Sequence, residues 1–335
     1  MKKTIVEDSF DTTRLAAFYR AQESQRQHAR FHDPYARRLA GERGEWIARH
    51  LPPGAAASWG IVLRTCIYDE LLLQLLQQEQ IDTVINLGAG LDTRPYRMDL
   101  PESLRWIEVD LPEILAYKQM HLSLEKPRCK LEQFSFDITD HTIRSSFLTE
   151  VCQETQQVLV LTEGVLIYLT AQQVISLVND LHEHQSLRWW LTEYVSPQSI
   201  KRDECTWNKL AGERARRFAP SGGITFFEQY GWKVAEFQTF FEAALRLKIS
   251  MPFGWLLKIL SRLAPRNEHT EETMKKAGGF VLLERAVVES LENETSIEHL
   301  PSSDLLEKCD QSIEEDCCID TAGTASSDAT SGSSK

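Results

Sequence analysis

The sequence lacks the features that mark three broad classes of protein. Its seven cysteines form no CxxC pair and have no matching histidine cluster, so neither a zinc site nor a disulfide framework is predicted. No run reaches the ~18 apolar residues of a membrane span. The N-terminal MKKTIVEDSF has two lysines followed by acids rather than an apolar core, so we expect no signal peptide. We therefore expect a cytoplasmic protein with no metal and no membrane contact.

The negative charge is confined to one end of the chain. The 335 residues carry a net charge of -12, but residues 286–335 hold 12 acidic and 2 basic side chains, which leaves 37 acidic and 35 basic ones for residues 1–285. Residues 301–335, rich in Ser and acids with hardly any aromatics, are expected to be a disordered tail. The near-neutral remainder argues against a nucleic-acid partner, although one basic concentration stands near the start, at Arg14, Arg20, Arg26, Arg30, Arg37 and Arg38.

The stretch VINLGAGLDTRPYR, residues 84–97, predicts a strand, a glycine turn and the start of a helix. At the carboxyl end of a first strand such a turn brings the backbone close to a nucleotide-like ligand, because Gly88 and Gly90 lack a Cβ. A purely structural turn fits these two residues equally well. The third glycine of the dinucleotide fingerprint is missing, since Thr93 stands there, which disfavours a bound diphosphate.

Acidic residues end the strand patterns that follow. Glu108 and Asp110 close the second, where a carboxylate can accept both hydroxyls of a ribose, and Asp137 with Ile138 closes the third. Glu163 closes the fourth. Solvated strand ends explain any one of these acids, but acids at the ends of successive strands favour a ligand site.

The whole pattern alternates strands and helices. Strands are predicted near 82–87, 104–109, 131–136, 158–163, 187–194, after Gly231 and at 278–285, which indicates a parallel, doubly wound α/β core. Helical patterns with breaks at residues 33–34, 41–44 and 52–54 precede it, and the helix that carries Arg64 starts after a break at Gly60 and ends near Gln78. We expect a helical cap at 1–80, a core at 81–300 and a helical lid insertion around 196–230.

The ordered motifs GAGLDTRPYR, EVDLP, FDI and LTEGVLIYL, with FHDPYARRL and Arg64, resemble the class I S-adenosylmethionine-dependent methyltransferases. Within that class they resemble the leucine carboxyl methyltransferase family, which includes tetracenomycin-type polyketide O-methyltransferases. The resemblance covers roughly residues 12–285. It implies a Rossmann-like sheet of seven strands, mostly parallel, whose closing strand inserts antiparallel beside the fifth.

The resemblance also implies a role for each motif residue in holding S-adenosyl-L-methionine. Gly88 and Gly90 would let the backbone approach the methionine part, while Arg64 would bind its carboxylate through a bidentate fork. Glu163 would hold the ammonium group. At the nucleoside end, Asp110 would accept the ribose hydroxyls in preference to Glu108, Asp137 would accept the adenine amino group, and the Ile138 backbone N–H would reach a ring nitrogen.

One departure from the family bears on the substrate. Alignment on HDPY places Gln22 where leucine carboxyl methyltransferases carry a basic residue, with Arg20 close but not aligned. We therefore expect an O-methyltransferase that acts on a carboxylate or hydroxyl oxygen of a small, polyketide-like acceptor. The alternatives are a protein C-terminal carboxyl methyltransferase, a nicotinamide-dependent oxidoreductase and a non-catalytic interaction protein. No general base is assigned, because His28, His32, Tyr168 and Tyr194 fit packing roles as well, and the oligomeric state is left open.

Overall fold

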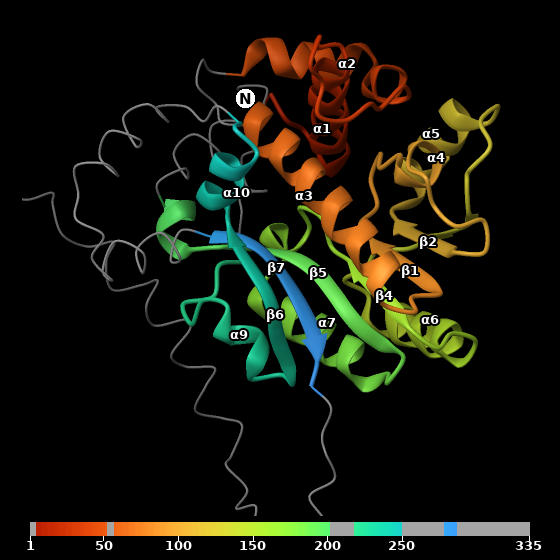
Figure 1. Cartoon of the computed structure of the whole chain (residues 1–335), viewed down its shortest axis with the longest axis vertical. Helices are drawn as coiled ribbons and strands as arrows, with labels where there is room; N and C mark the ends of the chain where they lie inside the picture. The colour runs from red at the N-terminus through yellow and green to blue at the C-terminus, as the bar shows by residue number, and fades with distance from the viewer. Residues whose placement is uncertain (1–4, 52–56, 202–217, 250–277, 287–335) are drawn as a thin grey trace, which may run out of the picture. The chain divides into compact units, whose positions relative to one another are not determined.

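The computed structural model describes residues 5–51, 57–201, 218–249 and 278–286, all in one unit that ends at Ala286. A seven-stranded sheet in the order β3-β2-β1-β4-β5-β7-β6 forms its centre (Figure 1). The strands are β1 (Thr83–Leu87), β2 (Arg105–Asp110), β3 (Lys130–Ser135), β4 (Val158–Leu161), β5 (Leu187–Val195), β6 (Trp232–Thr239) and β7 (Gly278–Arg285). They match the predicted strands to within about two residues at either end.

The sheet is parallel from β3 to β5, and β7 inserts antiparallel between β5 and β6. The predicted Rossmann-like architecture with one antiparallel closing strand is therefore confirmed. Every residue of β1 and β4 is buried, as expected for parallel strands that helices cover on both faces. Gly279 lets β7 fit, because a Cβ there would lie 2.3 Å from the carbonyl oxygen of Gln238.

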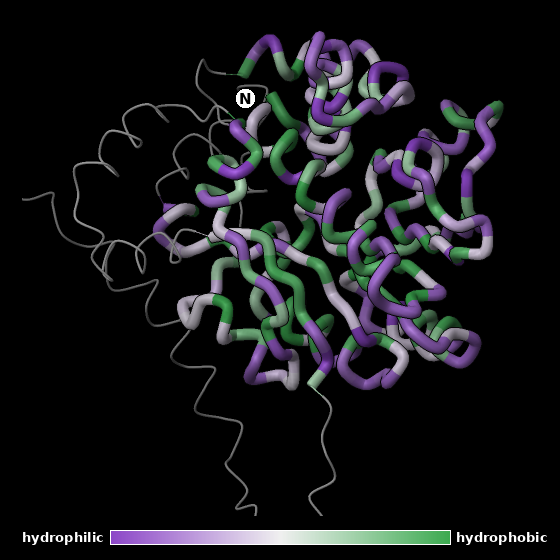
Figure 2. Tube along the Cα trace, viewed as in Figure 1, coloured by the Kyte–Doolittle hydropathy of each residue, from purple (hydrophilic) through white to green (hydrophobic). Residues whose placement is uncertain are grey.

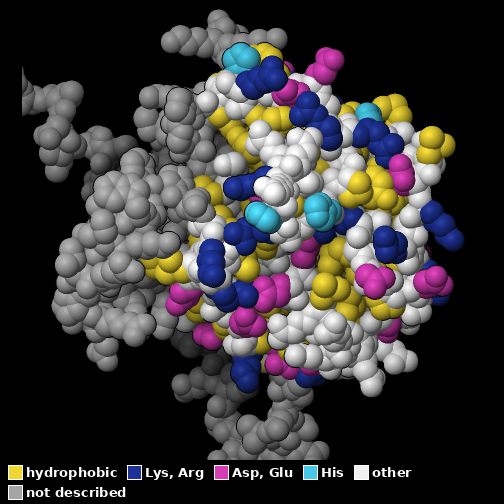
Figure 3. All heavy atoms as spheres, turned by 45° about the horizontal axis from the view of Figure 1, so that its top comes forward, with side chains coloured by type: hydrophobic (Ala, Val, Ile, Leu, Met, Phe, Trp, Pro, Cys, Tyr) yellow, Lys and Arg dark blue, Asp and Glu magenta, His cyan; other side chains and the backbone are white. Residues whose placement is uncertain are grey.

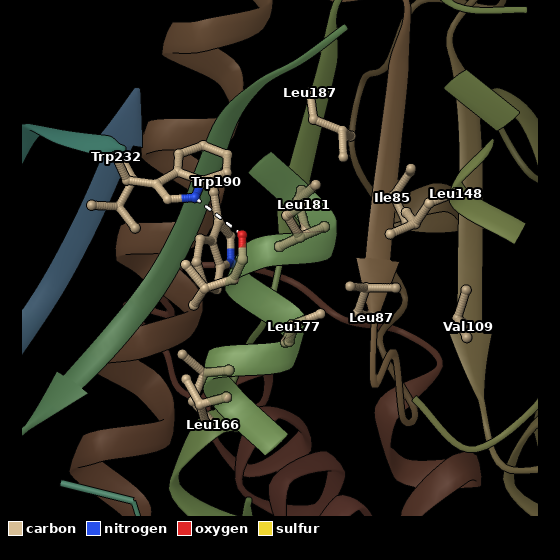
Figure 4. Packing of buried hydrophobic residues seen from close by; sticks show 14 of the residues in the cluster. Ile85, Leu87, Val109, Leu148, Leu166, Leu177, Leu181, Leu187, Trp190 and Trp232 are labelled. Atoms are coloured by element: carbon tan, nitrogen blue, oxygen red, sulfur yellow. Dashed lines mark hydrogen bonds between the residues drawn. The ribbon is translucent and has the colours of Figure 1, made fainter. Parts of the chain in front are cut away.

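Helices bury the two faces of the sheet in separate hydrophobic clusters, and hydrophobic residues run along the central strands (Figure 2). One face packs against α6 (His141–Gln153), α7 (Ala171–Glu183) and α9 (Thr225–Glu228). Within this cluster Trp190 and Trp232 pack edge to face, with ring centroids 5.5 Å apart (Figure 4). The opposite face packs against α3 (Ala57–Gln78) and α10 (Phe240–Arg246), so α3, expected in the cap, also covers the sheet.

The N-terminal helices α1 (Ser9–Ser24) and α2 (Ala36–His50) pack against each other and against residues that follow β1. Gly41 kinks α2 without ending it, since its φ of 57° interrupts the helical backbone. The predicted break at Gly60 is wrong, because α3 runs through this residue. A single glycine costs a helix only about 1 kcal/mol, which the apolar contacts of α3 offset.

Three short or peripheral helices complete the described fold. These are α4 (Arg94–Arg97), α5 (Pro112–Leu122) and the 3₁₀ turn η1 (Leu166–Tyr168). No helix in the described ranges is long and apolar enough to cross a bilayer. The predicted tail at 301–335 and residues 202–217 of the predicted lid lie outside the described residues.

Candidate functional site

The predicted site residues come together at the carboxyl edge of the parallel strands. Gly88 and Gly90 follow β1, Asp110 ends β2, and Asp137 and Glu163 follow β3 and β4. Because these four strands are parallel neighbours, their carboxyl ends share one edge of the sheet. This edge is where ligands bind in open α/β sheets.

The glycine turn after β1 needs its glycines for backbone conformation and for space. Gly88 has a φ of 72°, and a Cβ there would lie 2.5 Å from Cγ2 of Val165. Gly90 has a φ of 51°, and a Cβ there would lie 2.9 Å from Cγ2 of Thr13 on α1. The turn therefore has a structural requirement for glycine, because other side chains of the protein occupy the space that a Cβ would take.

Asp110 ties the second strand to this turn. Its Oδ2 accepts the Gly90 backbone N–H at 2.5 Å, and its Oδ1 accepts the N–H of Leu111 at 2.7 Å. Burial raises the pKa of Asp110, although these two hydrogen bonds oppose the shift. Each oxygen keeps further lone pairs, so the carboxylate can also accept hydroxyl groups from a ligand.

The side chain of Glu108 does not lie with the other predicted site residues at the carboxyl edge of the sheet. Its side chain is fully buried, with Oε1 2.6 Å from Nζ of the equally buried Lys118 on α5. Gln133 donates to its other oxygen at 2.8 Å. Glu108 is therefore committed to the interior, and Asp110 is the carboxylate of this strand that stands next to the turn.

Glu163 lies between two guanidinium groups. Its Oε1 accepts from Nε of Arg64 at 3.0 Å, and its Oε2 accepts from an NH1 of Arg94 at 2.6 Å. Burial favours a neutral carboxyl, but Arg94 and Arg64 hold the pKa of Glu163 below its ordinary value. Glu193 at the end of β5 faces Arg64 as well, with its Oε1 3.4 Å from Nε. Arg64 and Glu163, which were predicted separately for the carboxylate and the ammonium group of the ligand, therefore lie next to each other.

Arg94 and Glu193 were missed in the sequence as members of this cluster. The side chain of Arg94 is 2% exposed, and besides Glu163 it contacts Asp92 at 3.0 Å and Asp69 at 2.7 Å. A signal existed for both residues. Arg94 stands inside the quoted glycine motif, and Glu193 is an acid near a strand end, like the four that were singled out.

Asp137 and Ile138 form a turn beyond β3. The Asp137 carboxylate accepts the backbone N–H and the hydroxyl of Thr139, both at 2.8 Å. Within the described residues the backbone N–H of Ile138 donates to no protein acceptor, while its carbonyl accepts from Arg144 at 2.5 Å. An exposed carboxylate next to a free N–H is the donor and acceptor pair that the edge of an adenine ring requires.

The histidines and tyrosines considered as bases occupy other environments. His28 and His32 are exposed. Tyr194 is buried, and burial raises the pKa of its phenol, which makes it a poorer base near neutral pH. No residue is assigned as a general base.

The HDPY segment fastens the N-terminal helices to the turn. Asp33 accepts from Nε of Arg20 at 2.9 Å and from the hydroxyl of Thr93 at 2.7 Å. Arg20 also donates to the carbonyl of Leu91 at 2.5 Å, so it acts inside the protein. Gln22 on the same helix is exposed.

The N-terminal arginines are largely paired. Among the residues that the structure describes, carboxylates lie within 4 Å of five of the six, and the sixth, Arg30, donates to a backbone carbonyl. In Figure 3 basic side chains are interspersed with acidic ones. Among the described residues no group of His, Cys, Asp and Glu is arranged to hold a metal, and the three described cysteines are free, at Cys66, Cys129 and Cys152.

Residues 13–182 match the family model of the leucine carboxyl methyltransferases. The chain belongs to this family. It is 30% identical to a proposed S-adenosyl-L-methionine-dependent methyltransferase of Parafrankia sp. over 51% of this chain and 57% of the relative. A second relative with such a name, from Mycobacteroides abscessus, is 27% identical over 78% of this chain and 90% of its own length. The chain thus spans less than two thirds of the first relative.

The solved structure of a DUF574 family protein from Streptomyces avermitilis has the same fold. It superposes with a TM-score of 0.51 at 11% identity, covering 82% of this chain and 97% of that chain. This likeness shows that the two chains share one fold.

Proposed function

We propose that this member of the leucine carboxyl methyltransferase family is an S-adenosyl-L-methionine-dependent O-methyltransferase of small, polyketide-like molecules. The observation that carries the proposal is the Arg64–Glu163 pair at the strand edge that also holds the glycine turn and Asp110. S-adenosyl-L-methionine has an amino-acid end, a ribose and an adenine, and this edge offers a matching polar group for each.

The amino-acid end is assigned to Arg64 and Glu163. The guanidinium of Arg64 binds the ligand's carboxylate, and Glu163 accepts from its ammonium group. The assignment is supported by the position of both side chains beside the glycine turn that follows the first strand, because Glu163 accepts from Arg64 at 3.0 Å at this edge.

The nucleoside end is assigned to the next two strands. Asp110 accepts the ribose hydroxyls, since its carboxylate stands beside the turn and keeps unused lone pairs. Asp137 accepts the adenine amino group and the free N–H of Ile138 donates to a ring nitrogen.

The bound cofactor supplies an activated methyl group on a sulfonium, so the protein's task is to align the acceptor oxygen and to exclude water. The S–CH₃ bond breaks as the O–CH₃ bond forms. A carboxylate acceptor needs no base, whereas a hydroxyl acceptor must lose a proton. A carboxylate acceptor is compatible with a site that has no assigned base. A hydroxyl acceptor at such a site would have to be one that ionises readily.

A small acceptor is favoured by Gln22. It replaces the basic residue that the family's protein methyltransferases carry, and it points to solvent. The aromatic side chains of Phe227 and Trp232 pack around Trp190 in the core, so they give no evidence on the shape of the acceptor.

Calorimetry with S-adenosylmethionine, S-adenosylhomocysteine and NADH tests the cofactor. We expect micromolar affinity, about -8 kcal/mol, for the first two and none for NADH. Asp110→Ala and Glu163→Gln should weaken it strongly, while Glu132→Gln, a partly exposed carboxylate elsewhere on the sheet, should not. No binding by folded wild type would refute the proposal.

Product formation tests the acceptor. S-adenosylhomocysteine release is measured with aromatic carboxylic acids, phenols and a peptide with a free C-terminal leucine. Turnover of the small molecules supports the proposed branch, and turnover of the peptide alone would assign the chain to protein carboxyl methylation.

A further inference from the structure

The two arginines that contact Glu163 differ in burial and in the number of their partners, and this difference suggests a different role for each. Arg94 is 2% exposed and is held by three carboxylates, those of Asp69, Asp92 and Glu163. Arg64 is 22% exposed, and among the described residues only its Nε makes a hydrogen bond. One guanidinium is therefore locked in place, while the other has terminal nitrogens available for a ligand.

Gly164 keeps Arg64 at the edge. Its φ is 66°, and a Cβ there would lie 2.6 Å from NH1 of Arg64. The guanidinium thus lies flat against bare backbone beside Glu163.

We infer that Arg94 is a positioning residue: it holds Glu163 ionised and oriented for the ligand's ammonium group, which frees Arg64 to bind the ligand's carboxylate. The inference rests on the proposed function. Without Arg94, the buried Glu163 would depend on Arg64 alone, so the ligand's carboxylate would have to compete for that guanidinium.

Other charged or titratable groups also face this cluster. They are Tyr68 from α3, Asp92 from the turn after β1, and Glu193 from β5. Asp92, whose pKa is lowered by its arginine neighbours, is negatively charged and disfavours an ionised Glu163, whereas the Tyr68 phenol, whose pKa is raised by burial, stays neutral. The counter-charge at Glu163 therefore comes from the two arginines.

The test is the affinity for S-adenosylhomocysteine as a function of pH, measured by calorimetry on Arg94→Met. Loss of an arginine raises the pKa of a neighbouring carboxyl by ~1–3 units, so affinity should fall by about twofold to tenfold as the pH is lowered from about 8 to about 5. Wild type should stay flat over this range because both arginines keep Glu163 ionised. A flat profile for the variant at wild-type affinity would overturn the inference.

Two controls separate positioning from general damage. Arg97→Met removes a second buried arginine that contacts Asp69 but is not bonded to Glu163, and it should change the affinity by no more than about twofold. 5′-Methylthioadenosine, which lacks the amino-acid end, should bind Arg94→Met within about twofold of wild type. Equal losses for this nucleoside, or for Arg97→Met, would show a merely structural role.

A double-mutant cycle shows whether Arg94 acts through Glu163. In a Glu163→Gln background, where weak binding is followed at high ligand concentration, Arg94→Met should change affinity by no more than about twofold. Additive losses would overturn the inference. If Arg94→Met does not fold, Arg94→Lys is measured instead, because it keeps the positive charge without the planar guanidinium. It should bind more weakly than wild type, and its affinity should be equally independent of pH. Unchanged binding would contradict the orienting role. Failure of wild type to bind would instead refute the proposed function.

Discussion

Replacing Lys118 by methionine should destabilise the fold strongly, because it leaves the buried carboxylate of Glu108 without its positively charged partner. Nζ of Lys118 lies 2.6 Å from Oε1 of Glu108, and both side chains are 0% exposed. At an effective dielectric constant of about 20 their attraction is about 6 kcal/mol, most of which offsets the cost of burying two charges. Loss of one partner removes the attraction and leaves the burial cost of the other. We expect Lys118→Met to lower the free energy of unfolding at neutral pH by about 3–5 kcal/mol.

The loss should depend on pH with a definite sign. Burial raises the pKa of Glu108 even with Lys118 present, and removal of the ammonium group raises it further. A carboxyl whose folded pKa exceeds its unfolded value destabilises the fold above the folded pKa, and this effect disappears as the pH falls toward the unfolded value of about 4.3. The deficit of Lys118→Met relative to wild type should therefore shrink between about pH 7 and pH 5.

Denaturant unfolding followed by tryptophan fluorescence measures this deficit at each pH. Glu108→Gln combined with Lys118→Met should regain much of the stability, because no charge is then buried. Arg105→Met removes a partly exposed pair with Glu132 and should cost about 1 kcal/mol or less. A deficit that stays constant across the pH range, or an equal cost for Arg105→Met, would refute the reasoning.

Three further predictions concern the strand edge and its surroundings. Gly90→Ala should cost ~1–3 kcal/mol of stability through its positive φ and weaken S-adenosylhomocysteine binding, measured by melting and calorimetry; wild-type values in both would contradict the close approach to Thr13. Arg144→Met should weaken adenosine binding, because Arg144 holds the carbonyl of Ile138, and unchanged affinity would argue against this turn as the adenine site. Burial raises the pKa of Cys66 to about 12, so iodoacetamide should modify this thiol much more slowly in the native protein than in the unfolded chain, as read by peptide mass spectrometry.

The central strands β1 and β4 were predictable because parallel strands in the middle of a sheet are buried on both faces. Their apolar runs end at a glycine or a polar residue, as Thr83–Leu87 does before Gly88, and the predicted bounds of the closing strand, 278–285, agree with the structure. The strand-edge position of Asp110 and Glu163 followed from the same rule. These features depend on short segments of sequence and on the geometry common to all doubly wound sheets.

The side-chain pairing was not predictable in this way. Arg94 contacts Glu163 across 69 residues of sequence, and Glu108 finds its partner on the next helix. Strand alternation places Glu108 and Asp110 on one side, yet only the packing of α5 decides that one is covered and the other faces the turn. The break expected at Gly60 failed for a related reason, since tertiary contacts of α3 outweigh a local preference.

Thr93 shows how one substitution in the glycine motif serves the rest of the fold. Its position excludes the third glycine of a dinucleotide site, and its hydroxyl is fully buried, donating to Asp33 at 2.7 Å. The same carboxylate receives Arg20, which also holds the carbonyl of Leu91 in the turn. A glycine at residue 93 would leave one of these interactions unmade and loosen α1 from the turn that it covers at Gly90. With threonine at this position the motif no longer allows close approach of a diphosphate, but it attaches the N-terminal helices to the turn. This arrangement suits a ligand that has no phosphate.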